Sequence, residues 1–261
     1  HGASWTAIRG DLPDGELAWA LQQDHVEAEL LILAGETSLW FSLDGGGAWH
    51  RLDAGAPKIA YRDVQLQRRD DDIIGGTFGR GIFILDDYSP LRALARGVLA
   101  ADGGVMPLRD AWWYVPWQTN QAVGRPTLGA TAWAGPNPPF GATVTVHVPA
   151  LPRTAEEARR ANERELRDRG ADAPFPGYEA LRAERAESAP RLMVRVTDAS
   201  GSPVRDVPVP AREGVHRVTW DLRHPSPEPV SFFTPSFRPP WVGEAEGPLA
   251  APGSYGAQLV V

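Results

Sequence analysis

Residues 42–49 read Ser42-Leu43-Asp44-Gly45-Gly46-Gly47-Ala48-Trp49, which matches the pattern Ser-x-Asp-x-Gly-x-x-Trp. These residue types suit a tight turn at the end of a β-hairpin. An Asp carboxylate can accept backbone N–H groups within the turn, Gly permits a positive φ, and a Trp indole can fill the gap between neighbouring sheets. We therefore expect Ser42, Asp44, Gly46 and Trp49 to have structural roles.

The same arrangement recurs further along the chain. Residues 31–44, LILAGETSLWFSLD, are echoed by residues 73–86, IIGGTFGRGIFILD, and each stretch predicts a strand, a glycine-containing turn, a second strand and an Asp. This spacing fits the roughly 40–45 residues of one four-stranded β-propeller blade. Residues 1–100 thus predict a partial propeller of about two blades. Gly2–Trp5 fit the end of another such turn, so we expect further blades before residue 1.

Residues 137–261 predict a second β-domain. An alternating strand at residues 142–148 is followed by strand patterns at 192–198, 204–209, 214–223 and 253–261. Short strands separated by turns are typical of a β-sandwich, with Trp220 as its central core aromatic. Residues 101–136 are interpreted as a linker and aromatic packing segment between the two domains.

A helical insertion is expected at residues 153–189, which are rich in Arg, Glu and Ala. Thr154-Ala155-Glu156-Glu157 fits a capping box, and Gly170 with Pro174 separates a first helix from a second near residues 178–187. The insertion is either a solvated excursion or an arm that binds a partner. The predicted fold class is therefore mainly β, a partial propeller followed by a sandwich with a short helical insertion.

The composition narrows the function. A formal net charge of −7 disfavours nucleic acid and anionic membranes as main partners. The absence of Cys excludes disulfides, thiolate metal sites and cysteine nucleophiles. No apolar run reaches the roughly 20 residues of a transmembrane helix. The 25 Pro, 27 Gly and 10 Trp suit many short strands joined by tight turns.

Candidate chemistry is sparse. A glycosidase needs two carboxylates about 5–9.5 Å apart, and Asp70, Asp71, Asp72, Asp86 and Asp87 all fall in turns where Asp has an ordinary structural role. Arg80, between two glycines, can reach a carboxylate or glycan, or can pair with Asp86 or Asp87. The six His show no metal-binding spacing. The sequence predicts no catalytic residue, no metal ligand and no cofactor.

Two aromatic groups are candidate binding elements. Trp112, Trp113 and Trp117 can stack on sugars, line a protein interface, or pack in the core between the domains. A proline-rich stretch at residues 231–241 carries Phe232, Phe233, Phe237 and Trp241, which we interpret as a docking element for a partner protein.

Four motifs in this order carry a resemblance to a known family. They are residues 76–87 (GTFGRGIFILDD), 137–142 (NPPFGA), 216–223 (HRVTWDLR) and 251–255 (APGSY). Together they resemble the C-terminal region of bacterial sortilin-like proteins with BNR/Asp-box repeats, which are often labelled glycosyl hydrolases. The last two motifs also resemble immunoglobulin-like domains of the fibronectin type III kind. The resemblance implies a bacterial protein that is periplasmic or secreted.

These observations support one leading hypothesis and two alternatives. The leading hypothesis is a non-enzymatic, extracytoplasmic interaction or scaffolding module. It would be an extrinsic accessory subunit of a larger, membrane-associated complex. Its main partner would be a protein, and a glycan is the next candidate. The first alternative is the non-catalytic C-terminal part of a glycan-processing propeller enzyme. The second is a peptide binder similar to a sorting receptor.

Overall fold

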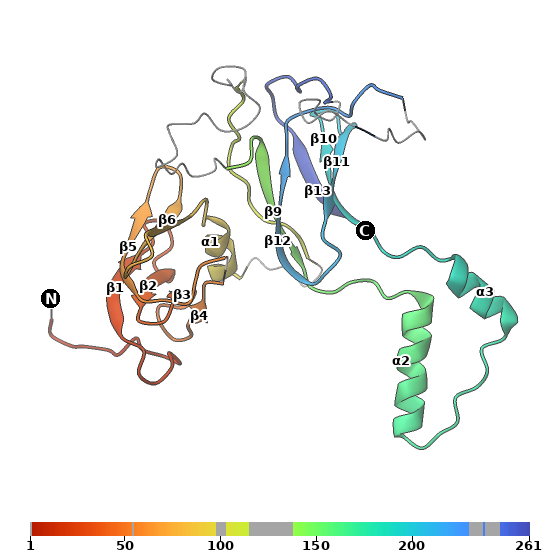
Figure 1. Ribbon diagram of the computed structural model, residues 1–261, viewed down its shortest axis with the longest axis horizontal. Helices are drawn as coiled ribbons and strands as arrows, with labels where there is room; N and C mark the ends of the chain where they lie inside the picture. Colours follow the sequence, from red (N-terminus) through yellow and green to blue (C-terminus); the bar gives the residue numbers. More distant parts are fainter. Residues whose placement is uncertain (1, 54, 98–102, 115–137, 230–236, 238–245) are drawn as a thin grey trace. The chain divides into compact units, whose positions relative to one another are not determined.

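The computed structural model describes residues 2–53, 55–97, 103–114, 138–229, 237 and 246–261. Antiparallel sheets dominate and helices are few, so the chain is mainly β, as predicted (Figure 1). None of the helices in these ranges is long and apolar enough to cross a membrane. The chain divides into two compact units, residues 1–100 and 101–261, and each is described by itself.

The first unit contains two sheets whose strands follow one another in chain order. The first sheet consists of β1 (Ala18–Gln23), β2 (Leu31–Gly35), β3 (Leu39–Ser42) and β4 (His50–Arg51). The second consists of β5 (Tyr61–Gln67), β6 (Asp72–Thr77) and β7 (Ile82–Leu85), followed by helix α1 (Pro90–Ala95). Both copies of the predicted repeat, at residues 31–44 and 73–86, form antiparallel hairpins.

One hydrophobic core joins these two sheets. The first sheet contributes Ile32, Ala34 and Leu39, and the second contributes Val64 and Ile73. Because side chains alternate between the faces of a strand, Leu31 and Leu33 point to the opposite face of the first sheet, where they pack with Trp49. The core therefore uses one face of each sheet.

The second unit has two three-stranded sheets around its own core. One has the order β12 (Gly214–Trp220), β9 (Ala142–Val148), β8 (Gly104–Val105), and the other β11 (Pro203–Val209), β10 (Leu192–Thr197), β13 (Gly256–Val260). Val146 and Val194 from the two sheets share one cluster with Trp220, which is 3% exposed. Trp220 is therefore a core aromatic, as predicted.

Part of the stretch predicted as a linker belongs to this second unit. β8 pairs with β9, and Met106, which follows β8, is buried. Further along, Trp113 Nε1 donates to the carbonyl of Ala250 at 2.9 Å. Residues 104–113 are thus attached to the second unit through backbone and side-chain contacts.

The two predicted helices form α2 (Ala155–Asp168) and α3 (Tyr178–Ala186). The predicted capping box is confirmed, since Thr154 Oγ1 accepts from the N–H of Glu157 and Glu157 Oε2 accepts from the N–H of Thr154. Neither helix has a buried residue. Arg159 on α2 joins the two helices by bonding to both carboxylate oxygens of Glu184 on α3.

Candidate interaction surfaces

The turn at residues 42–49 is held by its own polar side chains. Asp44 Oδ1 accepts from the N–H groups of Gly47 and Ala48, each at 2.9 Å, and from Ser42 Oγ at 2.7 Å. The hydrogen bond from Ala48, followed by that from Ser42, keeps the pKa of Asp44 below its ordinary value. Ser42 Oγ also accepts from the N–H of Gly46. All four polar contacts stay within the turn.

Trp49 lies on the face of the first sheet that points away from the core shared with the second sheet. Its indole is 6% exposed and packs with Leu31 and Leu33 on the outer face of the first sheet. Its Nε1 donates to the carbonyl of Ile8, and its backbone N–H donates to Asp11. The indole thus fastens the N-terminal segment to the first sheet, and it does not fill a gap between the two described sheets, whose shared core lies on the other face.

Asp86 and Asp87 differ in their surroundings. Asp86 is exposed, whereas Asp87 is buried, has a positive φ of 52°, and accepts from Ser89 Oγ at 2.6 Å. In the first hairpin Ser42 pairs with Leu31, and in the second Leu85 pairs with Ile73, so Ser42 and Leu85 occupy equivalent positions. Asp44 lies two residues after Ser42, and Asp87 lies two residues after Leu85. Asp87 is therefore the structural counterpart of Asp44. Its contact with Ser89 gives it a structural role at the start of α1.

Arg80 lies exposed in the turn between β6 and β7, where its N–H donates to Thr77 Oγ1 at 3.1 Å. Of its two predicted partners, Asp87 accepts from Ser89, and Asp86 also has an interaction of its own. The pairing of Arg80 with either carboxylate therefore stays a prediction.

A buried ionic cluster joins the two sheets to α1, and no local sequence pattern predicted it. Arg92 on α1 bonds to both carboxylate oxygens of Asp24 and to both of Asp71. Asp24 lies after β1 and Asp71 lies between β5 and β6, so each follows the first strand of its sheet. Tyr88 completes the cluster by donating to Asp24 at 2.5 Å. Asp71, one of the candidate acids, is therefore engaged by an arginine.

A second cluster, which no local sequence pattern predicted, lies on the surface of the first unit. The guanidinium of Arg62 lies 3.7 Å from the ring centroid of Trp19 and 5.2 Å from that of Phe78. Glu36 accepts from Trp19 Nε1 at 2.6 Å and lies 3.4 Å from Arg62. Cation–π stacking of this kind contributes roughly 0.5–1 kcal/mol at exposed positions. We interpret the cluster as a local brace between the two sheets.

The outer face of the second sheet carries three isoleucines on β6 and β7, beside polar residues of β5 such as Gln65. Ile82 is 68% exposed and Ile84 is 60% exposed, and Ile74 pairs with Ile84 on the same face. In the first sheet, the positions equivalent to these are Ile32, Leu39 and Phe41, judged by the strand pairing. Those three belong to, or pack against, the core between the sheets. The same face is therefore covered in one copy of the repeat and open in the other.

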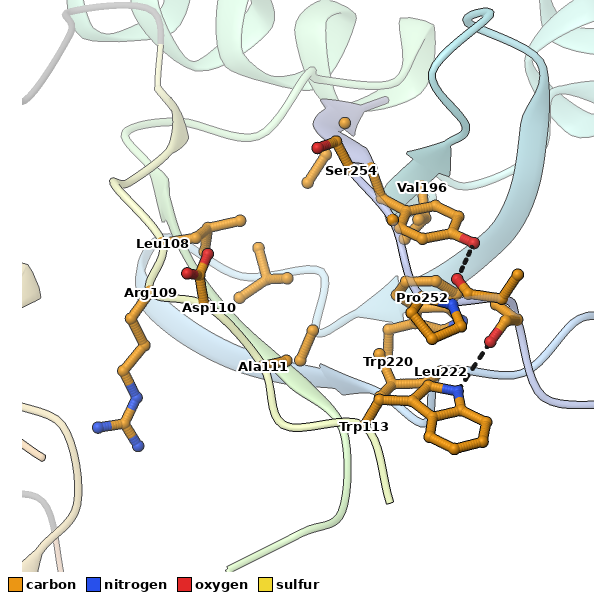
Figure 2. Close-up of a pocket in the computed structure, with 18 residues that line it drawn as sticks. Leu108, Arg109, Asp110, Ala111, Trp113, Val196, Trp220, Leu222, Pro252 and Ser254 are labelled. Atoms are coloured by element: carbon orange, nitrogen blue, oxygen red, sulfur yellow. Dashed lines mark hydrogen bonds between the residues drawn. The ribbon is translucent and has the colours of Figure 1, made fainter. Parts of the chain in front are cut away.

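The second unit contains a cavity of about 580 Å³ (Figure 2). Its floor includes the buried residues Val196 and Trp220. Trp113 and Tyr255 form part of its wall, and Tyr255 is fixed by a 2.6 Å bond from its hydroxyl to the carbonyl of Ala251. A volume of this size falls within the roughly 300–1,000 Å³ of ligand-binding pockets.

The remaining aromatic candidates are dispersed. Trp112 is 82% exposed and does not line the cavity, although its neighbour Trp113 does. Phe237 is 71% exposed. The structure does not describe the other four candidates, which are Trp117, Phe232, Phe233 and Trp241.

Among the described residues, no three His, Asp or Glu side chains are grouped so that they could hold a metal ion. Comparisons of the chain with protein-family models, with curated proteins and with solved structures found no match.

Proposed function

We propose that this chain is a non-enzymatic, extracytoplasmic interaction or scaffolding module of a bacterium, serving as an accessory subunit of a larger, membrane-associated assembly. In this proposal the first unit consists of about two blades of an Asp-box β-propeller, and the second unit is an immunoglobulin-like sandwich. The sequence resemblance supports both assignments and the location. The order of β1 to β4 and the turn held by Asp44 fit a propeller blade.

One observation carries the proposal, namely the exposed isoleucines on the outer face of the second sheet. Removing apolar surface from water is favourable by about 25 cal/mol per Å². Exposed isoleucines that lie together on a sheet are therefore a typical mark of a protein contact. In this chain, the equivalent face of the first sheet shows that such a face does receive another sheet.

The acids do not favour a catalytic role for the first unit. Asp24 and Asp71 are paired with Arg92, and Asp87 accepts from Ser89. A general acid needs a raised pKa, whereas the pKa of Asp24 is held below its ordinary value, because hydrogen bonds led by that from Arg92 outweigh the opposing effect of burial. A module that binds through its surface accounts better for these contacts.

The test is a comparison of purified complexes. The wild-type chain and the double variant Ile82→Lys with Ile84→Lys would be expressed with an affinity tag in the source organism, and co-purifying proteins would be quantified by mass spectrometry. We expect a stoichiometric partner with the wild type and its loss with the double variant. Val215→Lys, at a residue 52% exposed in the other unit, is the matched control.

Far-UV circular dichroism would establish that all variants fold. If the wild-type chain purifies alone under conditions that preserve complexes, or if the double variant retains the same partner, the proposed function is wrong.

A further inference from the structure

The backbone edge of β9 is open beside the cavity of the second unit. β8 pairs with β9 at Gly104 and Val105, and the N–H of Met106 then donates to the carbonyl of Thr145 at 2.9 Å. Continuing this register would place Leu108 opposite Thr143. Among the described residues, no hydrogen bond joins these two. Pro107, which has no N–H, precedes the point where the two strands separate.

The direction of the free backbone groups follows from the pairing. Backbone groups of an antiparallel strand alternate between its two neighbours. The carbonyl of Thr145 points toward β8. Thr143 lies two residues away on the same strand, so its N–H and carbonyl point to the same side, where β8 no longer pairs with β9. On the other side, Thr143 lies opposite Thr219 of β12. Such an edge can pair with an added extended segment.

The cavity lies next to this edge and can accept a side chain. Leu108, Ala142 and Val144 line it on the β9 side, and Trp113 and Tyr255 line it as well. Its floor is apolar, with Val196 and Trp220 nearly fully buried beneath it. Binding energy at protein interfaces is concentrated where a large side chain enters such a pocket.

The carboxylate of Asp110 offers a contact for a basic ligand, although Arg109 also lines the cavity. Asp110 lines the cavity and forms no hydrogen bond or ion pair in the described part of the chain. Figure 2 shows the side chain of Arg109 extending away from the other lining side chains. The net charge of −7 also favours a cationic partner.

We propose that this edge and cavity bind an extended peptide segment of a partner protein. The peptide pairs with the free backbone groups of Thr143, inserts an apolar side chain between Trp113 and Tyr255, and presents a Lys or Arg to Asp110. This mode of recognition combines backbone pairing for affinity with a side-chain pocket for specificity. The proposal is independent of the isoleucine face of the first unit, because it uses a different unit and different residues.

A library of linear peptides displayed on phage is the probe. We expect selection on the full chain to enrich sequences with an apolar residue two positions from a Lys or Arg, because alternate side chains of an extended peptide lie on the same face. Synthetic peptides of the enriched sequence would then be titrated by calorimetry. Trp113→Ala should weaken binding about tenfold or more, the loss expected for an anchor residue. Trp112→Ala, at the exposed neighbour that does not line the cavity, should leave the affinity unchanged.

Two further measurements separate the parts of the proposal. Methylating the peptide backbone nitrogens one at a time should abolish binding at the position that pairs with Thr143, without altering the protein. Asp110→Asn should weaken binding and reduce its dependence on salt.

The proposal is overturned if no peptide is enriched or if the selected peptides bind Trp113→Ala as tightly as wild type. It is also overturned if no single N-methylation matters, since the backbone edge is then unused. Binding of neutral oligosaccharides from a glycan array, lost in Trp113→Ala when no peptide binds, would assign the cavity to sugars instead.

Discussion

Arg92 donates to Asp24 through two nitrogens, Nε to Oδ2 at 2.8 Å and Nη2 to Oδ1 at 2.9 Å, although 68 positions separate the two residues. The Asp24 side chain is fully buried and that of Arg92 nearly so. Because Arg92 also bonds to Asp71, a single guanidinium ties α1 to the ends of both sheets. The cluster is thus a long-range contact that fixes how the first unit is assembled.

Removing the guanidinium leaves buried charge without a partner. Arg92→Met retains much of the aliphatic bulk but leaves the buried carboxylate of Asp24 without its ion-pair partner. Breaking a buried ion pair in this way lowers the free energy of unfolding by about 3–5 kcal/mol. Urea unfolding followed by tryptophan fluorescence should show this loss. Arg69→Met removes an exposed pair with Asp70 and should change stability by less than about 0.5 kcal/mol. Equal effects of the two substitutions would contradict a structural role for the cluster.

The same cluster predicts a loss of stability in acid. Burial alone would raise the pKa of Asp24, but hydrogen bonds from Arg92, then Tyr88, then the N–H groups of Glu27 and Val26 hold it well below its ordinary value. His25 also faces the carboxylate, with Nδ1 3.5 Å from Oδ1.

A carboxyl whose pKa is lower in the folded state than in the unfolded state stabilises the fold above its unfolded value, about 3.9. That contribution is lost as the pH falls toward the folded value. We expect the urea midpoint of the wild type to decline below about pH 5, and Asp24→Asn to be less stable at neutral pH with a shallower decline. A variant with the same pH slope as wild type would exclude Asp24 as the cause.

Local signals in the sequence predicted the elements well. The alternation at residues 142–148 became β9 with the same bounds, and Thr154 to Glu157 became the cap of α2, because these patterns depend on neighbours in the chain. Trp220 was predicted as a core residue from its place in a strand pattern, and it is buried.

Long-range relationships could not be predicted in the same way. Nothing near Asp24 or Asp71 in sequence distinguishes them from other aspartates in turns, since their partner Arg92 lies 68 and 21 positions away. The alternation at residues 82–85 predicted a strand but could not tell which face is covered. Pro107 was the one available signal for the open edge of β9, because proline cannot continue a ladder.

Gly141 is predicted to tolerate no side chain. Its φ is 128°, and a Cβ there would lie 1.9 Å from the carbonyl oxygen of Trp220. Gly214 has a similar φ of 111° but faces open space. Backbone strain of about 1–3 kcal/mol is expected for an alanine at either position, and the clash adds to it only in Gly141→Ala. Thermal unfolding of both variants should show the larger loss of stability for Gly141→Ala. Equal losses of stability would mean that backbone strain alone accounts for the effect.

The cap of α2 is predicted to act locally. Thr154→Ala removes the acceptor for the N–H of Glu157, and loss of such a cap costs a helix roughly 0.5–2 kcal/mol. A helix of 14 residues is marginal in water without packing, and α2 has no buried residue, so its first turns should open more often. Hydrogen exchange followed by mass spectrometry should therefore show lower protection across residues 157–164 with an unchanged urea midpoint for the two β-sheet units. Thr154→Ser keeps the hydroxyl and should restore the protection. If the global midpoint falls together with the local protection, α2 supports the core of the second unit and is not an independent arm.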